Sequence, residues 1–119
     1  MELNVHKINE TYIIDILGEM DIYNASQLRS LFSNMLSKNV RSFIINMQNV
    51  DYIDSAGIGA LIYICEKISK EDLQLAIVNV HGIVQTVIEL TKLGFYFPIY
   101  DSIDEAVVKF QEEMSFMPV

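Results

Sequence analysis

The segment DYIDSAGIG at residues 51–59 places one serine among carboxylates and glycines. It follows a short apolar run and precedes a helical pattern, so Ser55 stands where the N-cap of a helix belongs. Gly57 and Gly59 lack a Cβ atom, which leaves the Ser55 hydroxyl and nearby amides accessible to a large binding partner. A phosphate on Ser55 would meet the positive end of the helix dipole and be tolerated there. The pattern predicts a modified or contacted serine. The alternative is a plain helix cap, with glycines that only permit close packing.

A second segment, GEMDIYN at residues 18–24, links a predicted strand to a predicted helix. Taken alone it is a turn followed by an N-cap, for which Asn24 or Ser26 is suitable. If the sheet is parallel from the second strand onward, this loop and the Ser55 loop open at the same end. Asp21 and Asp54 would then surround Ser55 with negative charge and suit an incoming lysine or arginine.

An apolar binding patch is expected next to these carboxylates, with contributions from Ala56, Ile58 and Tyr23. Helical spacing equally allows Ile58 to be buried. The residues that we expect to contact a partner are Asp21, Tyr23, Asn24, Asp54, Ala56, Gly57 and Ile58.

Enzymatic, nucleotide and metal sites have little support in the sequence. A nucleophile elbow needs a glycine two residues before the serine, and Ile53 stands there. A catalytic triad would have to use His6 or His81. No Gly-x-x-x-x-Gly-Lys or Gly-x-Gly-x-x-Gly loop occurs, and one cysteine with two distant histidines is not a metal ligand set. We therefore expect no enzyme activity, no catalytic residue, no cofactor site and no metal site.

Composition narrows the classes of partner. The chain has 119 residues, 8 Lys and Arg against 16 Asp and Glu, and a formal net charge of −8. Nucleic acids and anionic membranes attract proteins with a basic surface, so neither is an expected partner. A hydrophobic share of 51% excludes a disordered chain, and the length suits one domain over residues 1–119.

The expected location is the cytoplasm. Cys65 is the only cysteine and cannot form an internal disulfide. The first residues lack the basic and then apolar build of a signal peptide. No apolar run approaches the roughly 20 residues that a membrane helix needs.

Strand and helix patterns alternate along the chain. Apolar, β-branched and aromatic runs predict strands at Met1–Lys7, Thr11–Leu17, Ser42–Met47, Leu73–Val78 and within Phe95–Tyr100, with a loop at Gln48–Asp54. Three- and four-residue spacing predicts helices that start near Ala25, at Ser55, over Gly82–Leu93 and after Ser102. The first two strands form an expected hairpin. The fold class is therefore α/β, with a mixed, mostly parallel sheet of about five strands and about four helices.

Three features together resemble the bacterial anti-sigma-factor antagonists, the STAS-domain family. They are the Gly-Glu-x-Asp loop that starts at Gly18, the apolar strand at Phe43–Met47, and the Asp-Ser-x-Gly-x-Gly stretch at 54–59. Their order and spacing agree over nearly the whole chain, and the helix after Ser102 has a counterpart in the family.

The resemblance implies a partner switch. Members bind an anti-sigma factor that is also a serine kinase of the histidine-kinase-like ATPase type, and this binding frees a sigma factor. The kinase phosphorylates the serine after the aspartate, here Ser55, which ends the binding, and a PP2C-type phosphatase reverses the modification. ATP and Mg²⁺ belong to the kinase, and we expect the free antagonist to be a monomer. The alternative is the same fold without phosphorylation, as a regulatory subunit of a transporter or of another signalling complex.

Two positions depart from the family pattern. Ala56 stands where a second hydroxyl residue is common, which leaves Ser55 as the one phosphoacceptor of this segment. The stretch Asn46–Asn49 replaces one that often carries an acidic residue, and this difference bears on which partner is recognised.

Overall fold

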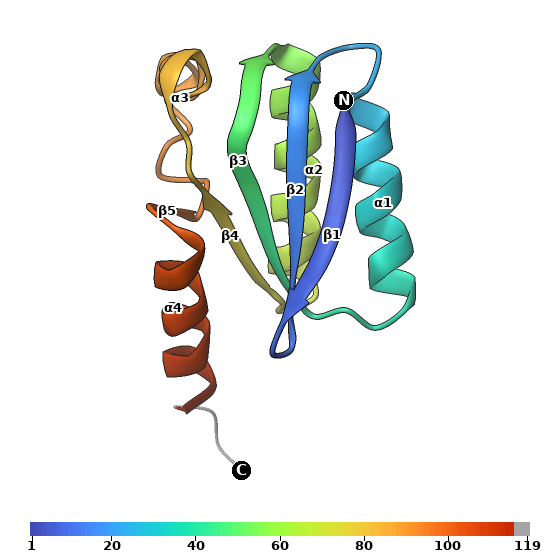
Figure 1. Cartoon of the computed structure of the whole chain (residues 1–119), viewed down its shortest axis with the longest axis vertical. Helices are drawn as coiled ribbons and strands as arrows, with labels where there is room; N and C mark the ends of the chain where they lie inside the picture. The colour runs from blue at the N-terminus through green and yellow to red at the C-terminus, as the bar shows by residue number, and fades with distance from the viewer. Residues whose placement is uncertain (116–119) are drawn as a thin grey trace.

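The computed structural model describes residues 1–115, and this part of the chain folds into a layered α/β domain (Figure 1). The elements are β1 (Glu2–Ile8), β2 (Thr11–Met20), α1 (Ala25–Ser37), β3 (Ser42–Ile53), α2 (Ser55–Lys70), β4 (Gln74–Val78), α3 (Gly82–Thr91), β5 (Ile99–Tyr100) and α4 (Ile103–Ser115). The predicted fold class is confirmed. The predicted domain at 1–119 extends four residues beyond the described part.

The five strands form one sheet in the order β1-β2-β3-β4-β5. β1 and β2 are an antiparallel hairpin, and its turn places Asn9 at a positive φ of 55°. The pairs from β2 to β5 are all parallel. β2 and β3 therefore end at the same end of the molecule, where α2 begins and beside which α3 lies (Figure 1). This confirms the expected placement of the two loops.

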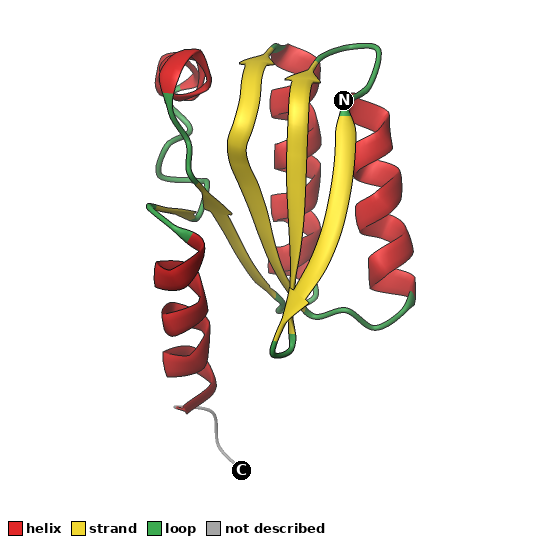
Figure 2. Cartoon of the chain, in the orientation of Figure 1, coloured by secondary structure: helices red, strands yellow, loops and turns green. Residues whose placement is uncertain are grey.

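Alternating side chains divide the sheet into two faces. One face packs with α1, α2 and α3 in the main core, which includes Phe32, Phe43, Ile45 and Leu61, all at most 1% exposed. The other face packs against α4 in a smaller core, to which α4 contributes Phe110. The part of this second face that lies over β1 and β2 carries no helix in the described chain (Figure 2).

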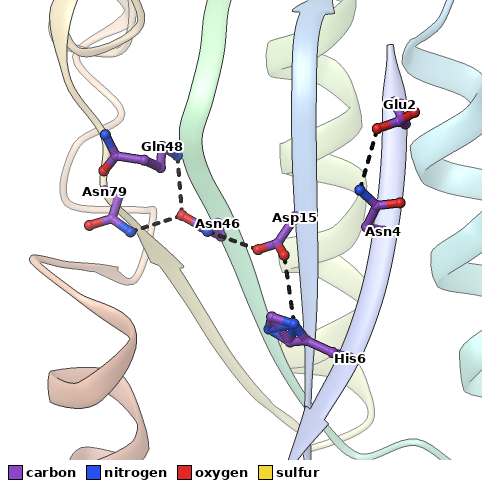
Figure 3. A network of polar contacts seen from close by, with 7 residues as sticks. All are labelled: Glu2, Asn4, His6, Asp15, Asn46, Gln48 and Asn79. Carbon is purple, nitrogen blue, oxygen red and sulfur yellow. Dashed lines mark hydrogen bonds and ion pairs between the residues drawn. The ribbon is translucent and has the colours of Figure 1, made fainter.

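A polar network runs across the strands from β1 and β2 to β3 and the residue after β4 (Figure 3). Asn46 donates to Asp15 Oδ1 at 2.8 Å and accepts from Asn79 Nδ2 at 2.8 Å and from the backbone amide of Gln48 at 3.1 Å. The β2–β3 register shifts just after the Asp15–Asn46 pair. The Asn46 side chain thus binds the amide of a strand residue at a bulge.

β3 differs from its prediction. It continues through the predicted loop at 48–54 and ends at Ile53. Beyond Asn46 it pairs with β2 but not with β4, and two register shifts interrupt its alternation. Because the bulges break the period of two, the sequence pattern is typical of a loop although the backbone is a strand.

Two later elements are shorter than predicted. β5 contains only Ile99 and Tyr100, because the preceding segment forms turns. α3 ends at Thr91, where Lys92 adopts a left-handed conformation with a φ of 59°. Within residues 1–115, the helices are too short or too polar to cross a lipid bilayer.

Candidate functional site

Asp54 is the N-cap of α2. Its Oδ1 atom accepts hydrogen bonds from the backbone amides of Ala56 at 2.9 Å and Gly57 at 3.3 Å. The amide of Ile58 donates to the Asp54 carbonyl at 3.0 Å. Three amides of the first helical turn, those of Ala56, Gly57 and Ile58, are therefore bound by one residue.

Ser55 is the first residue of α2 and is exposed. The prediction that its hydroxyl caps the helix is wrong, because the longer side chain of Asp54 reaches the same amides from one position earlier. Within residues 1–115 the Ser55 hydroxyl forms no hydrogen bond with another residue. Ser55 is therefore accessible at the surface of the described chain.

The β2–α1 loop is held by a reciprocal pair of hydrogen bonds. Asp21 Oδ1 accepts from the amides of Tyr23 at 3.0 Å and Asn24 at 3.2 Å, and Asn24 Oδ1 accepts from the amide of Asp21 at 2.9 Å. This is the arrangement of a capping box, shifted to begin at Asp21. Asn24 immediately precedes α1 as expected, but its side chain makes no cap bond to the helix, and Ser26 is simply exposed.

Two hydrogen bonds join this loop to the start of α2. Asp54 Oδ2 accepts from the amide of Ile22 at 3.3 Å, and the amide of Asp54 donates to the Met20 carbonyl at 3.2 Å. The carboxylates of Asp21 and Asp54 are thereby fixed in adjoining loops at one end of the sheet, and Ser55 follows Asp54 directly. Asp51, near the end of β3, is also exposed.

The remaining predicted contact residues differ in accessibility. Tyr23 is 89% exposed. Ala56 is half-buried, whereas Gly57 and Ile58 are buried, Ile58 being only 6% exposed. Ile58 thus follows the core alternative that helical spacing allowed. Contact of these residues with a partner stays a prediction.

Sequence reasoning missed two exposed apolar residues. Ile22 is 73% exposed in the β2–α1 loop, and Tyr52 is 44% exposed near the end of β3. The available signal for Ile22 was its position between Asp21 and Tyr23 in a predicted loop. Ile22 and Tyr23 are consecutive exposed apolar residues in the loop that contains Asp21.

Two other side chains that could take part in chemistry, those of His81 and Cys65, are hydrogen-bonded or buried. The His81 ring is bonded at 2.8 Å to the carbonyl of Gln48. Burial, with a smaller effect from the charge of Glu66, raises the pKa of the Cys65 thiol to about 11. In the described chain, no three His, Cys, Asp or Glu residues are grouped so that they could hold a metal ion.

Known proteins are similar to this chain in sequence and in fold. A family model described as STAS domain matches residues 2–106. The anti-sigma-B factor antagonist of Staphylococcus aureus is 27% identical over 95 residues, covering 78% of this chain and 88% of that protein. A crystal structure of an anti-sigma factor antagonist from Mycobacterium paratuberculosis has a TM-score of 0.81 at 23% identity, covering 91% of this chain and 92% of that one. The phosphorylated form of the Bacillus cell fate determinant SpoIIAA has a TM-score of 0.70 at 19% identity, covering 91% and 97%.

Proposed function

We propose that this chain, which belongs to the STAS domain family, is an anti-sigma-factor antagonist whose partner binding is switched off by phosphorylation of Ser55. The unmodified chain would bind an anti-sigma factor that is also a serine kinase and so release a sigma factor. The observation that carries this proposal is the exposed Ser55 hydroxyl, which has no hydrogen bond to the described chain and stands beside a carboxylate fixed by three backbone amides.

The local hydrogen bonds explain why a phosphate on Ser55 would act on a partner. The modification adds about −1.5 to −2 charges. Asp54 already occupies the amides of Ala56 and Gly57, so these donors are not free to neutralise the phosphate. The new charge therefore remains at the surface next to Asp54, with Asp21 in the adjoining loop. Because the phosphate replaces no internal contact of Ser55, we expect the backbone to stay nearly unchanged.

The binding surface combines charge with exposed apolar side chains. Asp21 and Asp54 suit a lysine or arginine of the partner. Ile22 and Tyr23, 73% and 89% exposed, lie in the loop that Asp54 holds. Large apolar side chains of this kind supply much of the affinity at protein interfaces. A phosphate beside them would repel acidic groups and hinder the burial of apolar ones.

The chain itself would act as a substrate and a binding module, not as an enzyme. ATP and Mg²⁺ would be supplied by the kinase, of the histidine-kinase-like ATPase type, and a PP2C-type phosphatase would remove the phosphate. The antagonist needs no cofactor of its own, and we propose that it works in the cytoplasm as a monomer when free.

The test uses the unmodified chain as bait in an affinity pull-down with ADP or ATP, followed by incubation of the captured kinase with ATP and the chain. Mass spectrometry should find one phosphate, on Ser55. Modification at another residue, or no kinase captured, would contradict the proposal.

Binding measurements then test the switch. Ser55→Ala should bind the kinase as the wild-type chain does, and Ser55→Asp should bind about a hundred-fold more weakly, equivalent to about 2.7 kcal/mol. Ser30→Asp is the matched control, because it adds the same charge at an exposed position of α1. Equal affinities of Ser55→Asp and Ser30→Asp would contradict the electrostatic explanation.

A further inference from the structure

The two glycines of α2 differ in whether the packing of the fold requires them. A Cβ atom on Gly57 would lie 2.5 Å from the Met20 carbonyl oxygen and 2.6 Å from Ile53 Cγ1, so the close packing requires a glycine. A Cβ atom on Gly59 would meet no atom within 4 Å. Glycine inside a helix lowers stability relative to alanine. The fold therefore gains nothing from Gly59 that alanine would not supply.

Gly59 lies in an apolar groove between α2 and α3. The groove has a volume of about 330 Å³, and its lining includes Ser55, Gly59 and Ile62 from α2 and Val87 and Leu90 from α3. Ser55, Gly59 and Ile62 follow one another at four and three residues along one side of the helix. Leu90 is 76% exposed although it is aliphatic. The groove is thus continuous with the surface around the Ser55 hydroxyl.

We propose that this α2–α3 groove receives an apolar side chain of the kinase that acts on Ser55, and that Gly59 lacks a side chain to admit it. The inference rests on the proposed function, because the occupant is that same kinase. Ser55 is part of the groove lining, so a protein that closes over the hydroxyl also covers the groove. Asp54 directly precedes Ser55 and Asp21 lies in the adjoining loop, so the inserted side chain should have a lysine or arginine close to it.

Gly59 variants separate this proposal from a structural role, because stability and affinity should move in opposite directions. Gly59→Ala should raise the melting temperature while it weakens binding to the kinase by about ten-fold. Gly59→Leu, which fills the groove, should weaken binding further. Ser69→Ala is the matched control on α2, since Ser69 is exposed and lies outside the groove lining. It should leave affinity unchanged.

Leu90→Ala provides a second test that does not involve the backbone of α2. Leu90 is mostly exposed, so its truncation should leave the melting temperature nearly unchanged while lowering affinity. Binding is measured by titration calorimetry with the kinase shown to phosphorylate Ser55, in the presence of ADP.

The possible results distinguish the groove proposal from its alternatives. Wild-type affinity in Gly59→Leu and Leu90→Ala would overturn the groove proposal while the Ser55 switch stands. A lower melting temperature of Gly59→Ala would show that the fold requires Gly59, and this result would also overturn the groove proposal. A wild-type dimer in sedimentation that Gly59→Leu disrupts would make a second copy the occupant. If the wild-type chain binds no kinase, the proposed function itself fails.

Discussion

Asp54 and Ile22 are joined by a 3.3 Å hydrogen bond from the Ile22 amide to the Asp54 carboxylate, across 32 residues of the chain. The other carboxylate oxygen of Asp54 caps α2. One side chain thus positions a helix start, a neighbouring loop and a negative charge, all next to Ser55. Any rearrangement of this residue should affect stability and binding together.

Two substitutions of Asp54 separate the helix cap from the contact with Ile22. Asp54→Ala removes the cap and the Ile22 contact and should lower the free energy of unfolding by about 1–2 kcal/mol. Asp54→Asn keeps one oxygen that can cap α2 but places an amide nitrogen opposite the Ile22 amide, which loses its acceptor, so its loss of stability should be smaller than that of Asp54→Ala. Urea denaturation measures both. Ser55→Ala is the control and should change stability by less than about 0.5 kcal/mol, because its hydroxyl has no partner. A larger loss in Ser55→Ala would contradict the assignment of the cap to Asp54.

Gly57→Ala should destabilise the chain although alanine favours helices. The added Cβ would lie 2.5 Å from the Met20 carbonyl oxygen, which is itself held by the Asp54 amide at 3.2 Å. The overlap should lower the free energy of unfolding by about 1–3 kcal/mol in urea denaturation. Stability equal to or above the wild type would show that β2 and α2 can separate without cost.

Asn46→Asp should introduce a pH-dependent loss of stability. The Asn46 amide donates to Asp15 Oδ1 at 2.8 Å, and a second carboxylate there replaces attraction with repulsion. At pH 7 the free energy of unfolding should fall by about 2 kcal/mol. Repulsion raises the pKa of the carboxyl pair in the folded state, so the loss should shrink as the pH falls through that raised pKa and one proton is taken up.

The control for this substitution is Asn34→Asp, at an exposed position of α1. It should show no comparable pH dependence between pH 7 and pH 4. If Asn46→Asp lowered the free energy of unfolding equally at pH 7 and pH 4, the result would contradict the contact between Asn46 and Asp15.

Cys65 should be unreactive in the folded chain. Cys65 is 7% exposed, and burial, followed by the charge of Glu66, raises the pKa of its thiol to about 11. Because the thiolate is the nucleophile, iodoacetamide at pH 8 should label the folded chain about a hundred-fold more slowly than the denatured chain. The neutral thiol contributes to stability below about pH 8.5, and this contribution is lost as the pH rises towards 11.

A cysteine placed at Ser30 in a Cys65→Ser background provides the comparison for labelling, since Ser30 is exposed. It should react at nearly the same rate in the folded and denatured chains. Equal rates for Cys65 in the two states would mean that α2 opens readily at this position.

Sequence periodicity by itself determined the order and type of the elements. Residues such as Leu28 and Phe32 in α1, or Ile14 and Ile16 in β2, repeat with the period of the element that buries them. The same local signals indicated that the Ser55 and Asp21 loops lie at one end of a parallel sheet. Ser55 is exposed, as its place in the loop predicted. Its phosphorylation stays a prediction.

Only the tertiary structure decided which residue caps α2, how far β3 extends, and that Gly57 but not Gly59 is required for packing. The extent of β3 and the requirement for Gly57 depend on atoms that are distant in sequence, and the capping residue Asp54 is itself bonded to the distant Ile22. A one-dimensional pattern records which residues avoid water, but it does not contain the distances between elements. Those distances arise when the helices close on the sheet, and they determine which groups at the Ser55 surface remain free.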